Sequence, residues 1–199
     1  MQFDYPNWSN IHHNHWQAIF DKYLTQPTLQ MLEIGCFEGR STMWFADKLD
    51  KSDRSTLFCV DNWLGGEEVV RSKLDFDMKL VRSNFYENVR NHRLAPRIVT
   101  HEADSEVFLS MHMPRFYRFF DFIYLDGSHT QRDTLVDLTM CLGMLKSKGV
   151  LIVDDYMNAM NTKNPLLRPK DAVDFIVKSF GDEIEFFTTP ELQAVIIRK

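Results

Sequence analysis

Four short apolar runs in this sequence each end at a glycine or an aspartate, and this pattern limits the fold more than any other feature. The runs are 31–34, 57–60, 122–125 and 150–153, and the residues that follow them are Gly35, Asp61, Asp126 and Asp154. Stretches with apolar residues at every third or fourth position separate the runs, at about 41–49, 67–90 and 130–145. Strand-length runs that alternate with helix-length stretches predict an α/β fold, in which helices cover both faces of a mostly parallel sheet.

Other segments complete this expected sheet. Residues 97–100 predict a further strand, and residues 170–180 predict a further helix. Thr130 has the position of a helix N-cap, with Asp133 three residues later. The closing segments 183–187 and 194–197 flank a Thr-Thr-Pro turn, so we expect an antiparallel pair at the end of the chain.

Length and composition point to one globular unit. The chain has 199 residues, of which 44% are hydrophobic and 26% charged, so we expect 1–199 to form a single domain rather than a disordered or fibrous protein. Its formal net charge of −5 supplies no general attraction for nucleic acid or for an anionic membrane. We therefore expect neither as a partner, while a homodimer stays open.

The cysteines and the apolar runs indicate the cellular compartment of the protein. Cys36, Cys59 and Cys141 lie far apart and lack the spacing of a zinc site or of a disulfide framework. Residues 1–15 contain no basic start followed by an apolar stretch, and each apolar run is much shorter than the roughly 20 residues of a membrane helix. We expect a cytoplasmic protein without a signal or an anchor.

Acidic residues gather at the predicted strand ends. In open α/β sheets, ligands bind beyond the carboxyl ends of the strands. Asp61, Asp126 and Asp154 all follow such ends. Because aspartate also favours turns and helix caps, the same pattern has a purely structural explanation. The agreement of several strands favours a ligand site.

The loop after the first strand restricts the class of ligand. A dinucleotide-binding loop places a glycine where this sequence has Phe37, and Glu38 brings a negative charge to the start of the next helix, where a phosphate would bind. This favours a nucleoside ligand without phosphates over a nicotinamide dinucleotide. Asp61 suits the two hydroxyls of a ribose. The alternative is that Gly35 and Gly39 only allow close packing of strand and helix.

Three motifs resemble a known family. Residues 32–42, with Gly35, Gly39, Ser41 and Thr42, resemble the glycine loop of class I S-adenosylmethionine-dependent methyltransferases. Residues 121–129 and 145–156 are more specific, and resemble the small-molecule O-methyltransferase branch that includes macrolide-sugar and aminocoumarin-sugar methyltransferases. The catechol type is a more distant likeness. The resemblance extends over about residues 28–180.

The resemblance implies a Rossmann-like three-layer sandwich, with a seven-stranded mostly parallel sheet and one antiparallel strand near the C-terminus. It also implies S-adenosylmethionine as cofactor. Glu33, Gly35, Gly39 and Ser41 would surround its methionine part, and Asp61 would hold its ribose. Asn62 or Trp63 would flank the adenine, and Asp104 and Ser105 would meet the adenine amino group. Asp126 would border the cofactor and, with Asp154 and Asp155, match the carboxylates that bind Mg²⁺ in metal-dependent relatives.

The chemistry of the three carboxylates supports a metal independently of the family. An alcohol is a poor nucleophile until it loses its proton, and a divalent cation bound to oxygens lowers the pKa of that hydroxyl. Mg²⁺ prefers a few carboxylates together with water and substrate oxygens. The alternative is that Asp126 and Asp154 only cap loops and that no metal binds.

His129 is the candidate base. Several sugar-methylating relatives carry an acid two residues after the first aspartate, whereas this sequence has Ser128 there. His129 follows directly, and imidazole titrates near neutral pH, as a general base requires. It could equally bind the metal or be an ordinary surface residue.

Two segments without a recognisable motif are expected to shape the acceptor pocket. These are an N-terminal capping segment, 1–27, and a substrate-side loop, 156–169. We therefore predict an S-adenosylmethionine-dependent O-methyltransferase that acts on a small hydroxylated molecule, with Asp126 and His129 in the catalytic site and a divalent metal assisting them. The alternatives are a catalytically silent protein with the same fold and, less favoured, a nicotinamide-dependent oxidoreductase.

Overall fold

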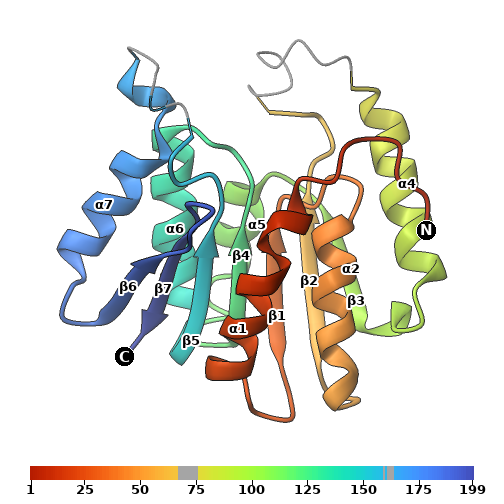
Figure 1. Cartoon of the computed structure of the whole chain (residues 1–199), viewed down its shortest axis with the longest axis horizontal. Coiled ribbons are helices and arrows are strands. Elements are labelled where there is room, and N and C mark those ends of the chain that lie inside the picture. The colour runs from red at the N-terminus through yellow and green to blue at the C-terminus, as the bar shows by residue number, and fades with distance from the viewer. Residues whose placement is uncertain (67–75, 159, 161–163) are drawn as a thin grey trace.

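The computed structural model describes residues 1–66, 76–158, 160 and 164–199, and is built around one seven-stranded sheet (Figure 1). The strand order is β3-β2-β1-β4-β5-β7-β6. The strands are β1 (Gln30–Ile34), β2 (Thr56–Asp61), β3 (Ile98–Glu102), β4 (Phe120–Leu125), β5 (Leu145–Val153), β6 (Ile184–Thr188) and β7 (Ala194–Arg198). All pairings from β3 to β5 are parallel, and β7 runs antiparallel to both of its neighbours. The predicted sheet with one reversed strand is confirmed.

Helices cover both faces of the sheet (Figure 1). Residues of α1, α2 and α4 form one apolar cluster with Met31 and Phe122, whereas residues of α5, α6 and α7 form the other with Leu32 and Ile123. Successive strand residues point to opposite faces, so central strands that are buried on both faces need apolar residues at nearly every position. The helices are α1 (His13–Tyr23), α2 (Arg40–Ala46), α4 (Met78–Asn91), α5 (Ser105–His112), α6 (Gln131–Met144) and α7 (Pro169–Ser179).

Helix α6 begins as its sequence predicts. The Thr130 hydroxyl accepts a hydrogen bond from the backbone N–H of Asp133 at 3.1 Å, which satisfies one of the free donors at the helix start. The predicted helix over 67–90 is only partly described, because residues 67–75 lie outside the described residues and α4 occupies 78–91.

The structure differs from the sequence prediction in three elements. Helix α5 was not predicted, yet Phe108 and Leu109 bury it against the sheet. Leu145, expected on the face of the preceding helix, is instead the first residue of β5, where it pairs with Phe120 across a bulge. Helix α1 lies within the expected capping segment 1–27, and its Trp16 is fully buried in the core. The first part of the chain is therefore packed into the core as well as onto the surface.

The strand order places a ligand site near β1. Strands β2 and β4 lie on either side of β1, so the connections after β1 and β4 leave toward opposite faces of the sheet and open a crevice between them. This crevice lies at the carboxyl ends of the strands, where the acidic residues are found. Among the described helices, none is both long and apolar enough to cross a membrane.

Candidate functional site

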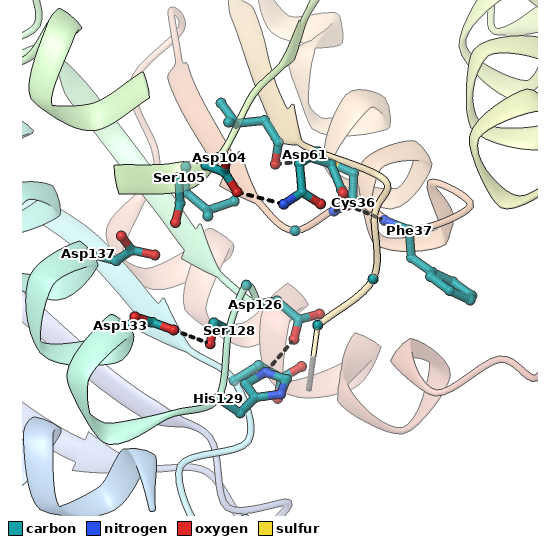
Figure 2. A pocket seen from close by; sticks show the side chains of 18 of the residues that line it. Cys36, Phe37, Asp61, Asp104, Ser105, Asp126, Ser128, His129, Asp133 and Asp137 are labelled. Carbon is teal, nitrogen blue, oxygen red and sulfur yellow. Dashed lines mark hydrogen bonds and ion pairs between the residues drawn. The ribbon is translucent and has the colours of Figure 1, made fainter. Parts of the chain in front are cut away.

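A cavity of about 650 Å³ lies at the carboxyl ends of the central strands (Figure 2). Its wall comes from the loop after β1, the end of β2, the start of α5 and the loop between β4 and α6, together with residues of the N-terminal segment and Asp154 after β5. Most of the predicted site residues line it: Gly35, Ser41, Asp61, Asn62, Asp104, Ser105, Asp126, His129 and Asp154. The size is within the range of pockets that hold a cofactor, roughly 300–1,000 Å³.

Gly35 is required because two loops touch at this position. Its φ is +82°, and an added Cβ would lie 1.9 Å from the backbone oxygen of Asp126. A side chain at this position would therefore push the loop after β1 away from the loop after β4. Gly39 is the N-cap of α2 and has a left-handed backbone conformation with φ of +87°, which glycine adopts without strain.

Asp61 holds the loop after β1 in place. Its Oδ2 accepts hydrogen bonds from the backbone N–H groups of Cys36 (2.8 Å) and Phe37 (3.0 Å), as Figure 2 shows. Its Oδ1 accepts one from the backbone N–H of Trp63. The carboxylate lines the cavity and keeps free lone pairs that can receive further donors. Asp61 thus shapes the loop in addition to lining the cavity.

Glu33 lies behind the cavity wall rather than in it. It is fully buried, and its Oε1 accepts a hydrogen bond from the Ser41 hydroxyl at 2.5 Å. Burial raises the pKa of Glu33 to about 7, and the hydrogen bond to Ser41 opposes this rise. Glu33 therefore positions Ser41, which does line the cavity.

The side chains at the end of β2 point in different directions. Asn62 lines the cavity and donates a hydrogen bond to Asp104 Oδ1 at 2.7 Å. Trp63 is 3% exposed, packs against Phe85, and donates from its indole N–H to the backbone oxygen of Phe37. The two residues predicted to flank a base are thus separated, with Asn62 on the cavity and Trp63 in the core.

His129 lies between two of the predicted carboxylates. Its Nε2 is 3.2 Å from Asp126 Oδ1 and its Nδ1 is 3.4 Å from Asp155 Oδ2. Burial, followed by repulsion from Asp154, raises the pKa of Asp126 well above its usual range, and the contact with His129 opposes this rise. About a third of the Asp126 side chain (32%) is still exposed, so water weakens these effects relative to a fully buried acid.

Asp154 is held by residues that the sequence prediction missed. Its Oδ2 accepts a short hydrogen bond from the Tyr124 hydroxyl, and its Oδ1 accepts one from the Gln193 side chain at 2.9 Å. The Nε2 atom of His12 lies 3.9 Å from Asp154 Oδ1. His12 and Gln193 lie far from Asp154 in the sequence, so no local motif indicates these contacts.

The predicted metal ligands do not form a compact group. Among the described residues, the only His, Cys, Asp or Glu donor atoms close enough together to hold a metal belong to Glu33, Cys36 and Cys59, within 4.8 Å of one another. Burial raises the pKa values of both thiols, which keeps them protonated. The three aspartates approach the same edge of the sheet, but His129 separates Asp126 from Asp155.

Glu38 connects the N-terminal segment to the cavity. It is 1% exposed and accepts hydrogen bonds from the backbone N–H groups of Asp4 (2.9 Å) and Tyr5 (3.2 Å) and from the Asn84 side chain (2.8 Å). The nearby residues Pro6, Trp8 and Ser9 line the cavity. From its sequence position Glu38 is expected only to exclude a phosphate, because partners so distant in sequence leave no local signal.

The fold and this site together define a Rossmann-like methyltransferase. The sequence profile described as "Methyltransferase domain" matches residues 32–156, which is more than half of the chain. The chain therefore belongs to the methyltransferase-domain family, and the predicted enzyme class is confirmed. No curated protein matches the chain significantly.

Solved structures of O-methyltransferases share the fold. The O-methyltransferase from Bacillus cereus in complex with SAH has a TM-score of 0.66 and 16% identity, and the match covers 97% of this chain and 83% of that one. The O-methyltransferase TomG from Streptomyces achromogenes, involved in tomaymycin synthesis and solved with SAM, has a TM-score of 0.65 and 12% identity, and covers 98% and 82%. Identities this low establish the shared fold alone.

Proposed function

We propose that this protein transfers a methyl group from S-adenosylmethionine to a hydroxyl oxygen of a small acceptor, with His129 as the base. The observation that carries the proposal is the position of His129, held between two carboxylates in the wall of the cavity that Asp61 also lines. A hydroxyl acceptor needs a base at this point, and imidazole is the side chain suited to that role near neutral pH.

The cavity suits the proposed cofactor in charge and in volume. Asp61, Asp126 and Asp154 all line it, and a surplus of carboxylates stabilises the positive sulfonium of S-adenosylmethionine. Asp61 would accept from the ribose hydroxyls, and Gly35 and Ser41 would adjoin the methionine part. The relatives solved with SAH or SAM share this fold, which is the further support for this cofactor.

The chain's own residues would carry the proton transfer. His129 would take the hydroxyl proton as the acceptor oxygen receives the methyl group. Bound S-adenosylmethionine would supply that methyl carbon and would retain the broken bond's electron pair on its sulfur. Asp126 would orient the ring through Nε2, because Asp155 is the more exposed of the two carboxylates (50% against 32%) and gives way more readily to a substrate at Nδ1. Both carboxylates stabilise the resulting imidazolium.

We also propose that a divalent cation assists the reaction. Asp126, Asp154 and Asp155 would hold it, and a hard cation such as Mg²⁺ suits a set of carboxylates. When bound, it would lower the pKa of the acceptor hydroxyl. The arrangement described here fits a cation only in the kind of ligand, because the imidazole ring separates two of the three carboxylates. Binding would therefore require His129 to turn away from at least one of them.

We propose that the N-terminal segment, 1–27, and the loop over 156–169 select the acceptor. Pro6 and Trp8 from the N-terminal segment line the cavity, and Trp8 lies 5.7 Å from Phe37, measured between ring centroids. Aromatic and proline side chains suit the apolar part of a small hydroxylated molecule. Of the expected substrate-side loop over 156–169, residues 159 and 161–163 lie outside the described part of the chain.

We also propose that the chain forms a single domain and acts in the cytoplasm.

Two measurements, made one after the other, test the proposed function. Calorimetry should detect S-adenosylhomocysteine binding and no NAD binding, because the loop after β1 disfavours a pyrophosphate. Methyl transfer from S-adenosylmethionine should then be followed with a panel of phenols, catechols and sugars, with His129→Ala against His13→Ala as a matched control on α1. Binding without transfer to any acceptor would favour the catalytically silent alternative, and unchanged turnover of His129→Ala would remove His129 as the base.

A further inference from the structure

Gln193 is a fully buried amide in contact with two residues of the cavity wall. Its amide oxygen accepts a hydrogen bond from the Trp16 indole N–H at 2.8 Å. Its amide nitrogen donates to Asp154 Oδ1 at 2.9 Å and to the Tyr124 hydroxyl at 3.4 Å. A buried amide is tolerated when its donors and its oxygen are paired in this way. Gln193 therefore connects α1, which carries Trp16, to the carboxylate that follows β5 (Figure 1).

The indole of Trp16 fixes which way the Gln193 amide faces. An indole N–H can only donate, so the amide oxygen has to lie against it. The amide NH₂ group then has to face Asp154, because the reverse orientation would bring two donors together at Trp16 and two oxygens together at Asp154. Trp16 is itself held in place, since it is fully buried and its ring centroid lies 5.2 Å from that of Tyr124. A residue of the N-terminal segment thus determines that Asp154 receives a donor.

The hydrogen bonds around Asp154 leave one lone pair for a ligand. A carboxylate has about four accepting positions, two on each oxygen. Both positions on Oδ1 are used, by the Gln193 amide and by the backbone N–H of Asp155 at 2.8 Å. Oδ2 accepts from the Tyr124 hydroxyl, its one hydrogen-bond donor among the described residues. Because Asp154 lines the cavity and 15% of its side chain is exposed, a ligand there can use the second position on Oδ2.

We propose that Gln193 is a positioning residue for methyl transfer, which fixes the Asp154 carboxylate so that only Oδ2 is offered to the acceptor side of the cavity. This inference rests on the proposed function, in which Asp154 contributes to the reaction. Without the amide, the carboxylate can rotate about its Cβ–Cγ bond and present either oxygen, and its charge loses a donor. Loss of this orientation should lower the rate of transfer more than it weakens cofactor binding.

A kinetic comparison tests whether Gln193 acts through Asp154. Gln193→Met keeps an unbranched side chain without the amide, and Gln17→Met is the matched control at an exposed position of α1. With an acceptor that the wild type methylates, kcat of Gln193→Met should fall by roughly tenfold or more, the effect of one hydrogen bond to a charged group, and S-adenosylhomocysteine affinity should stay within about twofold. Gln17→Met should match the wild type.

The double variant separates positioning from a structural role. Asp154→Ala with Gln193→Met should be no slower than Asp154→Ala alone, because the two side chains share one interaction. Losses that multiply in the double variant would overturn the inference. So would a Gln193→Met protein with a lower melting temperature and unchanged kcat, since Gln193 would then serve only as the partner of the Trp16 indole. Trp16→Phe frees the amide and should also lower kcat, which covers the case in which Gln193→Met does not fold.

A spectroscopic readout tests the same connection without turnover. The indole N–H peak of Trp16 in a proton–nitrogen correlation spectrum, assigned with Trp16→Phe, reports its hydrogen bond to Gln193. Asp154→Ala should shift this peak in the wild-type background but not in Gln193→Met. The Trp44 indole, whose ring lies against that of Trp16, is the internal control and should not move. An unmoved Trp16 peak would overturn the inference.

The outcomes also distinguish this inference from the proposed function. If the wild type methylates no acceptor, the proposed function fails and this inference fails with it. If the wild type transfers methyl groups and Gln193→Met transfers them equally fast, only the role of Gln193 is overturned.

Discussion

The protonation of Glu33 should make the stability of this protein fall as the pH rises. Glu33 is fully buried, and the pKa of its carboxyl is raised from 4.5 to about 7, chiefly by burial. The folded state therefore binds this proton more tightly than the unfolded chain does. The stabilisation is complete below pH 4.5 and is lost as the pH rises through about 7.

The size of the effect follows from the two pKa values. Each pH unit between them corresponds to about 1.4 kcal/mol, so the full loss is about 3.5 kcal/mol, of which roughly 2.5 kcal/mol falls between pH 5 and pH 8. Glu33→Gln removes the titration while keeping nearly the same shape. Its carbonyl oxygen can still accept the hydrogen bond from Ser41.

Urea unfolding at pH 5 and pH 8 measures this difference. The free energy of unfolding of Glu33→Gln, relative to wild type, should rise by about 2.5 kcal/mol between the two pH values, which is about 1 M in the urea midpoint. Glu87→Gln is the matched control, because 44% of the Glu87 side chain on α4 is exposed and its removal should leave the pH dependence nearly unchanged. Equal pH dependence in wild type and Glu33→Gln would show that folding does not raise the pKa of Glu33.

Four other changes test the site. Asp61→Ala should weaken S-adenosylhomocysteine binding by about 1.5–3 kcal/mol, the range for charge-assisted hydrogen bonds, and an unchanged dissociation constant in a folded variant would remove Asp61 from the site. His129→Ala should lower turnover by roughly 10²–10⁴-fold with the cofactor affinity retained, as stopped-time methyl-transfer assays and calorimetry will show. Chelator should abolish turnover and added Mg²⁺ restore it, with Asp154→Asn impaired in turnover but not in S-adenosylmethionine binding; full activity in excess EDTA rules out the metal. Gly35→Ala should lower the melting temperature, since its Cβ would lie 1.9 Å from Asp126 O, and an unchanged value would contradict the close packing of the two loops.

The sheet was predictable because its signals are local. Each central strand is a short apolar run with a glycine or an aspartate at its end, and Thr130 caps α6 through a residue three positions away. Helix α5 was missed because it is short and has only two fully buried apolar residues, Phe108 and Leu109. A pattern of that length is too weak to read from sequence alone.

The site was predictable in its position more than in its contacts. The strand-end aspartates do come to one cavity, as their places in the sequence predict. The partners of Asp154 could not be found in the same way, because Gln193 is 39 residues away along the chain.

The contact at Gly35 has a consequence for how this site can change. The loop that would hold the methyl donor and the loop that carries His129 meet with no space between them, because even a methyl group at Gly35 would overlap Asp126 O. A shift of one loop must therefore move the other, and random mutation here would disturb both reactants together. New acceptor preferences should arise instead from the N-terminal rim of the cavity, at Pro6 and Trp8. A library for altered substrate range is best confined to that rim.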